Sequence, residues 1–172
     1  MTDSFWDRRW FAKPVQECGA ARKILRLARF KISKFGPRKD DPPDCEGFVN
    51  GKWSAVEVTR LTHEKTRKRA VKAISQGKPP PYYSWKRDEV VRELQKQITT
   101  KAKGVARYKG GKYQRYVLVI HTAEFVLDGS TMREFLKGAT FQCGALTDVV
   151  LGLSYEPASK RCPTFRLRLI RV

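Results

Sequence analysis

The most constraining feature of the sequence is the dipeptide Asn50-Gly51, which separates the two strand-like runs Cys45–Val49 and Lys52–Leu61. Asn-Gly is the preferred pair for a type I′ turn, because both central positions of that turn need a positive φ. The pair therefore predicts an antiparallel hairpin. Because side chains alternate along a strand, it also predicts which of them share a face. The two faces of the second strand are Trp53, Ala55, Glu57 and Thr59, and Ser54, Val56, Val58 and Arg60.

Apolar spacing along the rest of the chain predicts a mixed α/β fold. Apolar residues at helical intervals predict helices over Val15–Ser33 and Trp85–Tyr108. The first helix is expected to end at the Gly-Pro break in Phe35-Gly36-Pro37. The fully apolar run Tyr116–Ile120 is typical of a central buried strand. The shorter predicted elements are helices over His63–Ser75 and Ser130–Lys137, and strands over Asp148–Ser154 and Thr164–Val172.

The charge balance points to a polyanionic partner. The 172 residues include 36 Lys and Arg against 17 Asp and Glu, which gives a formal net charge of +19. Nucleic acid is the default partner of a compact domain with such an excess. No run approaches the roughly 20 consecutive apolar residues of a membrane span, and Met1–Lys13 lacks a signal-peptide pattern. We therefore expect one cytoplasmic domain without membrane contact.

The cysteines exclude a conventional zinc site. Cys18, Cys45, Cys143 and Cys162 contain no CxxC pair, and neither histidine lies at zinc-finger spacing from a cysteine. Without a secretory signal, all four are expected to be reduced thiols.

Four charged residues interrupt the apolar pattern. Glu57 stands in the middle of a β-branched strand, Glu17 and Lys101 fall on the inward stripes of two predicted helices, and Asp44 precedes the hairpin. Buried carboxylates are costly unless they are paired or bind a cation. Converging carboxylates with one ammonium group suit a divalent-metal site that acts on a phosphoryl group.

The motif formed by these residues resembles that of a known superfamily. Pro43-Asp44, followed after the Asn50-Gly51 turn by Glu57-Val58-Thr59, resembles the PD-(D/E)XK nucleases. Their restriction-endonuclease-like fold has an αβββαβ core with a mixed sheet flanked by helices. The resemblance covers about Val15–Val126, and is greatest to bacterial members with E-V-T in place of E-x-K.

The resemblance implies a Mg²⁺-dependent or Mn²⁺-dependent endonuclease that hydrolyses phosphodiester bonds, with DNA as the favoured substrate. Asp44, Glu57 and the backbone carbonyl of Val58 would be the metal ligands, and Glu17 would match the acid of the first helix. Thr59 occupies the position of the motif lysine, and Lys101 is the natural substitute. A single domain over residues 1–172 is implied, with residues 127–172 completing the sheet. A homodimer is left open.

Each candidate also has a purely structural interpretation. Asp44 could simply begin a strand after a turn, and Glu57 could pair with an arginine. Glu17 could stabilise a helix N-terminus, and Lys101 could extend from the apolar stripe to solvent. The alternative functions are a catalytically inactive nucleic-acid-binding protein of the same fold and a structural protein of a ribonucleoprotein assembly.

A nucleic-acid surface is expected around the second helix and the proline-rich connection that follows it. Cations there would track phosphates, and aromatic rings would stack on unpaired bases. The alternatives are a solvated basic face and aromatic rings that close the core. The residues are Arg67, Lys68, Arg69, Lys72, Lys78, Tyr82, Tyr83, Lys86 and Arg87.

Overall fold

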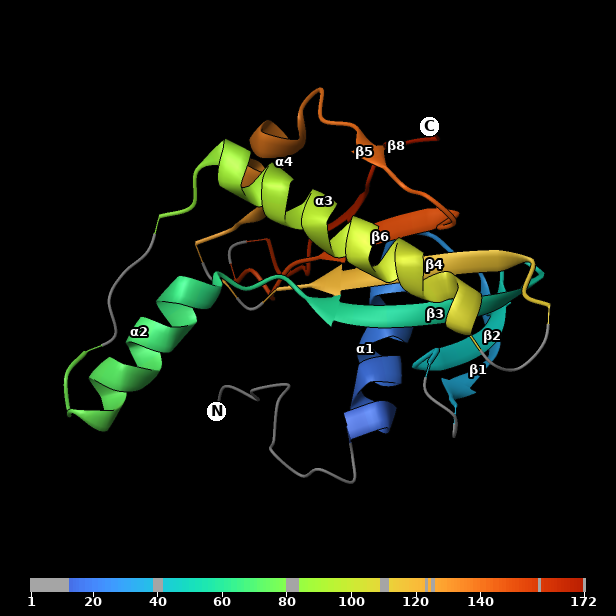
Figure 1. Ribbon diagram of the computed structural model, residues 1–172, viewed down its shortest axis with the longest axis horizontal. Coiled ribbons are helices and arrows are strands. Elements are labelled where there is room, and N and C mark those ends of the chain that lie inside the picture. Colours follow the sequence, from blue (N-terminus) through green and yellow to red (C-terminus); the bar gives the residue numbers. More distant parts are fainter. Residues whose placement is uncertain are drawn as a thin grey trace.

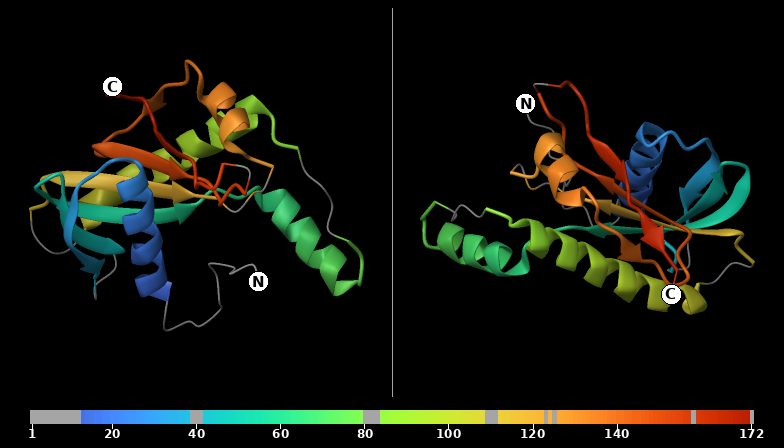
Figure 2. Two further views of the ribbon diagram at one scale, coloured as in Figure 1. Left: turned by 180° about the vertical axis from the view of Figure 1, so that it is seen from behind. Right: turned by 90° about the horizontal axis from the view of Figure 1, so that it is seen from above.

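The computed structural model describes residues 13–38, 42–79, 84–108, 112–122, 124, 126–157 and 159–171. These residues form an α/β fold around a mixed six-stranded sheet with the order β1-β2-β3-β4-β6-β7 (Figure 1). Helices α1 (Lys13–Leu27) and α3 (Arg87–Gly104) cover opposite faces of this sheet, as the view from above shows (Figure 2). The predicted mixed α/β fold is confirmed. No helix in the described parts of the chain is long and apolar enough to span a membrane.

The predicted hairpin is present. Strands β2 (Cys45–Val49) and β3 (Lys52–Arg60) pair antiparallel, with Val49 opposite Lys52. Asn50 and Gly51 take φ values of 50° and 77°, as a type I′ turn requires. The turn therefore sets the register that brings the start of β2 beside the middle of β3.

The first helix is shorter than predicted, and a strand follows it. Helix α1 ends at Leu27, and β1 (Ile32–Pro37) occupies residues assigned to the end of the helix and to its break. Arg29 adopts a left-handed conformation with φ 65°, and the amide of Phe30 donates a hydrogen bond to the carbonyl of Leu25. This arrangement is a Schellman-type helix end, which usually has glycine at the left-handed position. Because arginine stands there, the sequence does not signal where the helix stops.

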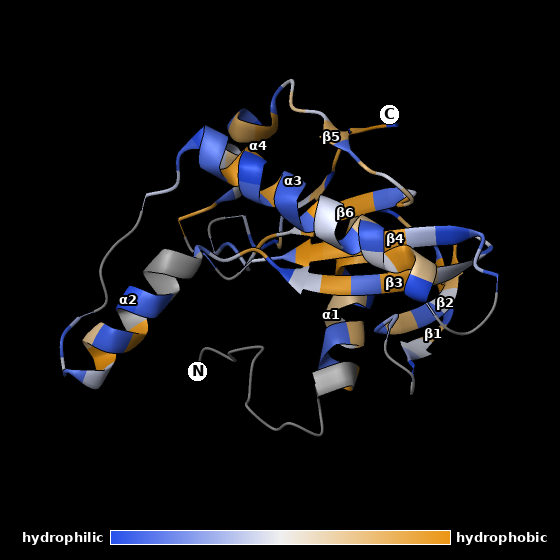
Figure 3. Ribbon diagram, in the orientation of Figure 1, coloured by the Kyte–Doolittle hydropathy of each residue, from blue (hydrophilic) through white to orange (hydrophobic). Residues whose placement is uncertain are grey.

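Two apolar clusters lie on the two faces of the sheet. On one face, Ala21 and Leu25 of α1 pack with Val56 and Val58 of β3. On the other, α3 packs against β4 (Arg115–His121) and β6 (Asp148–Gly152). Figure 3 shows hydrophobic residues along the centre of β3, β4 and β6. Strand β4 pairs parallel with both of its neighbours, which agrees with a central buried strand. Helix α3 continues into a 3₁₀ turn, Val105–Arg107.

The predicted last strand over Thr164–Val172 is wrong as a single element. Strand β7 (Thr164–Arg166) pairs with β6, whereas β8 (Leu169–Ile170) pairs with β5 (Phe141–Gln142) in a separate small sheet. Leu167 between them is buried. The alternation of apolar and basic residues continues through this crossing, so it does not show where the chain changes sheets. Helices α2 (Glu64–Ser75) and α4 (Gly129–Leu136) agree with the predicted helices.

Candidate active site

Glu57 and Lys101 form an ion pair between β3 and α3. Lys101 Nζ donates a hydrogen bond to Glu57 Oε1 at 2.5 Å, and the Glu57 residue is 6% exposed. The other carboxylate oxygen, Glu57 Oε2, is buried and has no hydrogen-bond partner among the residues that the structure describes. A buried anionic oxygen without a partner is costly, and a bound cation or water would satisfy it. The inward orientation predicted for Lys101 brings it to the carboxylate that interrupts β3.

Asp44 lies beside this pair. Cys45 is opposite Val56 in the hairpin register, so the preceding residue, Asp44, comes level with Glu57. The amide of Val58 donates a hydrogen bond to Asp44 Oδ2 at 2.7 Å. This contact orients the Asp44 carboxylate toward the centre of β3 rather than toward solvent. For Val58 the structure shows an amide contact to Asp44, and the predicted role of its carbonyl as a metal ligand remains a prediction.

The electrostatic environment of Asp44 shows that several acids are clustered. Burial, which is the largest cause, and the negative charges of Glu57 and Glu17 together raise the pKa of Asp44 from its usual 3.8 to about 6. The hydrogen bond from the Val58 amide and the charge of Lys101 lower the pKa but do not cancel the increase. The folded protein therefore destabilises the ionised form of Asp44, and a bound cation would reduce that destabilisation.

Glu17 contributes charge without completing a set of metal ligands. It lies in the second turn of α1, which begins at Lys13, so stabilisation of the first helical turn does not explain its presence. Among the described residues, no group of three or more His, Cys, Asp or Glu side chains is placed to hold a metal ion. The side-chain charges that act on Asp44 are thus those of two carboxylates, Glu57 and Glu17, and of the Lys101 ammonium group.

A disulfide joins the segments that carry two of these acids. Cys18 and Cys45 are bonded, with their Cα atoms 5.7 Å apart. The prediction of four reduced thiols is therefore wrong for this pair, whereas Cys143 and Cys162 are free. Cys18 follows Glu17 and Cys45 follows Asp44, so the bond ties α1 to the beginning of β2 at the acid cluster. The separation of 27 residues carries no recognisable spacing signal.

Gln97 is a polar residue of the α3–β3 interface, one helical turn before Lys101. Its Nε2 donates a hydrogen bond to the carbonyl of Arg60 at 3.0 Å. Within the described parts of the chain, its Oε1 is buried without a hydrogen-bond partner, as is Glu57 Oε2. Helix α3 therefore brings a second unsatisfied oxygen to β3, and helical spacing from Lys101 was the only sequence signal for it.

His121 does not have the properties of a general base. Burial, together with the charge of Arg60, lowers its pKa to about 4. It is 9% exposed at the end of β4. A neutral, buried histidine at a strand end has a structural role rather than a catalytic one.

The predicted nucleic-acid surface is only partly described. Tyr82 and Tyr83 lie outside the described residues, as does the side chain of Arg67. Helix α2 projects beyond the sheet (Figure 1). Arg87, at the start of α3, donates a hydrogen bond to the Lys137 carbonyl. The predicted cations with described side chains are all exposed, namely Lys68, Arg69, Lys72, Lys78, Lys86 and Arg87.

Comparisons of the sequence with protein-family models and with curated proteins, and of the structure with solved structures, found no match. The function of the chain is therefore inferred from the geometry and chemistry of its own residues.

Proposed function

We propose that the protein is a Mg²⁺-dependent nuclease that hydrolyses phosphodiester bonds in DNA and has a restriction-endonuclease-like core. The observation that carries the proposal is the pairing of a buried, unpartnered oxygen, Glu57 Oε2, with Asp44, whose pKa burial raises to about 6. Two neighbouring carboxylates of this kind suit a hard cation, for which oxygen is the preferred ligand. The order of a helix, a three-strand meander, two helices and a strand also supports this core, with α3 as the helix that packs on the sheet before β4.

Each residue of the site would have a separate role in hydrolysis. Asp44 and Glu57 would hold the cation, and the Val58 amide keeps Asp44 in place. When bound, the cation would neutralise phosphate charge and lower the pKa of a water molecule. Lys101 forms an ion pair with Glu57, and from that position its ammonium group would stabilise negative charge that develops on the phosphate. Hydrolysis forms a bond from water oxygen to phosphorus and breaks the bond from phosphorus to the leaving oxygen, which takes up a proton.

Cleavage of supercoiled plasmid with Mg²⁺ or Mn²⁺ tests the proposal. We expect Asp44→Asn and Glu57→Gln to reduce the nicking rate by about 10²-fold or more, and Lys101→Met by at least about tenfold. Glu93→Gln and Lys96→Met are matched controls, because this pair lies on the same helix, 3.8 Å apart, with the Lys96 side chain 68% exposed. Both control variants should cleave like the wild type.

Equal background cleavage by the wild type, Asp44→Asn and Glu57→Gln would refute the proposal of nuclease activity. Retained binding to plasmid would then favour the second candidate, a nucleic-acid-binding protein without catalysis. The absence of a three-ligand group among the described side chains favours that candidate. Circular dichroism of each variant separates loss of catalysis from loss of folding.

A further inference from the structure

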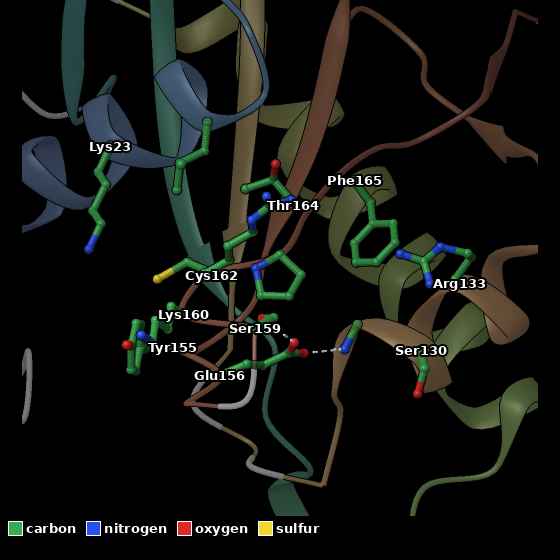
Figure 4. Close-up of a pocket in the computed structure, with 14 residues that line it drawn as sticks. Lys23, Ser130, Arg133, Tyr155, Glu156, Ser159, Lys160, Cys162, Thr164 and Phe165 are labelled. Atoms are coloured by element: carbon green, nitrogen blue, oxygen red, sulfur yellow. Dashed lines mark hydrogen bonds between the residues drawn. The ribbon is translucent and has the colours of Figure 1, made fainter.

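A large groove lies away from the acid cluster. It has a volume of about 790 Å³ and is bounded by α1, α4 and the connection between β6 and β7 (Figure 4). That volume falls within the usual range for ligand sites, roughly 300–1,000 Å³. None of Asp44, Glu57 or Lys101 lines it. The groove is therefore separate from the residues proposed to cleave the substrate.

The groove carries an excess of positive charge. Lys23 from α1, Arg133 from α4, and Lys160 and Arg161 from the β6–β7 connection line it. In the described parts of the chain, the side chains of Arg133, Lys160 and Arg161 form no ion pair. Cations from three separate segments thus line one groove, and at least three of them are available to an anionic ligand.

Among the described residues that line the groove, the only acid is Glu156, and its carboxylate is already hydrogen-bonded. The carboxylate of Glu156 accepts hydrogen bonds from the Gly129 amide, at the start of α4, and from Ser159 Oγ. Glycine at position 129 favours this close approach, because a Cβ there would make tight contacts, 3.0 Å from Pro163 Cγ and 3.2 Å from Glu156 Oε1. Glu156 therefore satisfies the N-terminus of α4, and its single negative charge is outnumbered by the cations that line the groove.

An exposed aromatic ring stands beside these cations. Tyr155 is 59% exposed, although large apolar side chains in this fold are mostly buried. Figure 4 shows Tyr155 beside Lys160, with Phe165 and Arg133 on the opposite side. An accessible ring next to cations is the combination that binds unpaired bases, because the ring stacks on a base while the cations contact phosphates. A duplex, whose base faces are already stacked, does not use the ring.

We propose that this groove binds a single-stranded segment of nucleic acid, with a base stacked on Tyr155 and phosphates held by Arg133, Lys160 and Arg161. The groove would retain an unpaired strand at a surface separate from the acid cluster. Binding does not depend on cleavage, so the proposal does not rest on the nuclease assignment.

Binding of a fluorescent 15-nucleotide oligothymidylate to the full chain in EDTA and low salt tests the proposal. We expect Tyr155→Ala to weaken binding by about fivefold or more and to leave the affinity for a duplex of equal length unchanged. Arg133→Ala with Arg161→Ala should weaken single-strand binding by at least about tenfold. Lys103→Ala, at an exposed position of α3, is the matched control and should bind like the wild type.

The alkylation rate of Cys162 reports directly whether the groove is occupied. It lines the groove and is partly exposed, whereas Cys143 is 2% exposed and the other two cysteines form the disulfide. Saturating oligothymidylate should slow alkylation of Cys162 by iodoacetamide several-fold, and inorganic phosphate should not.

Three results would overturn the proposal. They are unchanged binding by both groove variants, alkylation of Cys162 at the same rate with and without oligothymidylate, and equal protection by inorganic phosphate, which would leave only an anion site. Binding is measured in EDTA, so its outcome does not depend on metal-dependent cleavage. A failure to cleave plasmid is thereby distinguished from a failure of the groove.

Discussion

Replacing Asp44 with asparagine should stabilise the protein at neutral pH and leave its stability unchanged in acid. The folded protein raises the pKa of this carboxyl from 3.8 to about 6. Below pH 3.8 the carboxyl is protonated in both the folded and the unfolded chain. Between the two pKa values the folded state binds more protons, so the free energy of unfolding falls as the pH rises, and above pH 6 this loss is complete. Because asparagine does not titrate, the variant does not undergo this fall in the free energy of unfolding.

The size of the effect follows from the shift. About two pKa units correspond to about 3 kcal/mol. Asp44 is partly exposed, so solvent screening reduces the expected gain to about 1–2 kcal/mol above pH 7. For a chain of this length, that gain raises the melting temperature by about 3–6 °C. Because asparagine keeps a side-chain carbonyl, it can still accept the hydrogen bond from the Val58 amide.

Thermal unfolding followed by circular dichroism, from about pH 4 to pH 8 in EDTA, measures the difference between the two proteins. The comparison with the variant is needed because the titration of His121 changes the stability of both proteins with pH in the opposite direction. Its folded pKa is lowered to about 4, so its contribution to stability is lost as the pH falls below its usual 6.5. Asp88→Asn, at a side chain that is 89% exposed, is the control and should show no rise in stability over this range.

Addition of Mn²⁺ near pH 7 extends this test to the metal. A cation bound by Asp44 and Glu57 should stabilise the wild type more than Asp44→Asn and so reduce the difference between them. The reasoning is refuted if the variant is less stable than the wild type near pH 8, or if the difference does not change with pH. Equal stabilisation of both proteins by Mn²⁺ would contradict the proposed ligands.

Three further predictions concern the fold. Gly152→Ala should cost about 1–3 kcal/mol of stability, because the added Cβ would lie 2.6 Å from Ile24 Cγ1; chemical denaturation measures it. Reduction of the Cys18–Cys45 bond should cost about 3–4 kcal/mol by releasing a loop of 27 residues, measured as a lower melting temperature with a phosphine reductant. Asp128→Ala should cost about 1 kcal/mol of stability at neutral pH, because Asp128 caps α4. The cost should be smaller below about pH 4, because hydrogen bonds lower the pKa of Asp128 and their contribution is lost as the carboxyl is protonated. Chemical denaturation at both pH values measures the two costs.

Each of these predictions has a control. Gly19→Ala, whose Cβ would meet nothing within 4 Å, should stabilise α1 rather than destabilise it. Cys18→Ser with Cys45→Ser should remove the effect of the reductant. Ser130→Ala should have a smaller effect than Asp128→Ala, because the amide of Thr131 keeps its acceptor, Asp128 Oδ1. An effect of reductant on the double serine variant, or a loss in Asp128→Ala that grows in acid, would contradict the interpretation.

The sequence alone determined the features that depend on neighbouring residues. Asn50-Gly51 predicted the hairpin because turn chemistry is local, and helical spacing predicted that Lys101 faces inward. Alternation along β3 identified Glu57 as a carboxylate in an apolar strand, and the α/β class followed from the order of such patterns.

Only the tertiary structure decided which distant residues meet. The partner of Glu57 is 44 residues away on α3, the Cys18–Cys45 bond links α1 to β2, and the groove around Tyr155 draws on three segments. The end of α1 and the division of the last strand also escaped prediction, since Arg29 takes a conformation usual for glycine and the strand crosses between sheets without a break in alternation. Periodicity reports the direction of a side chain from its own element, whereas the identity of its partner depends on how the elements pack.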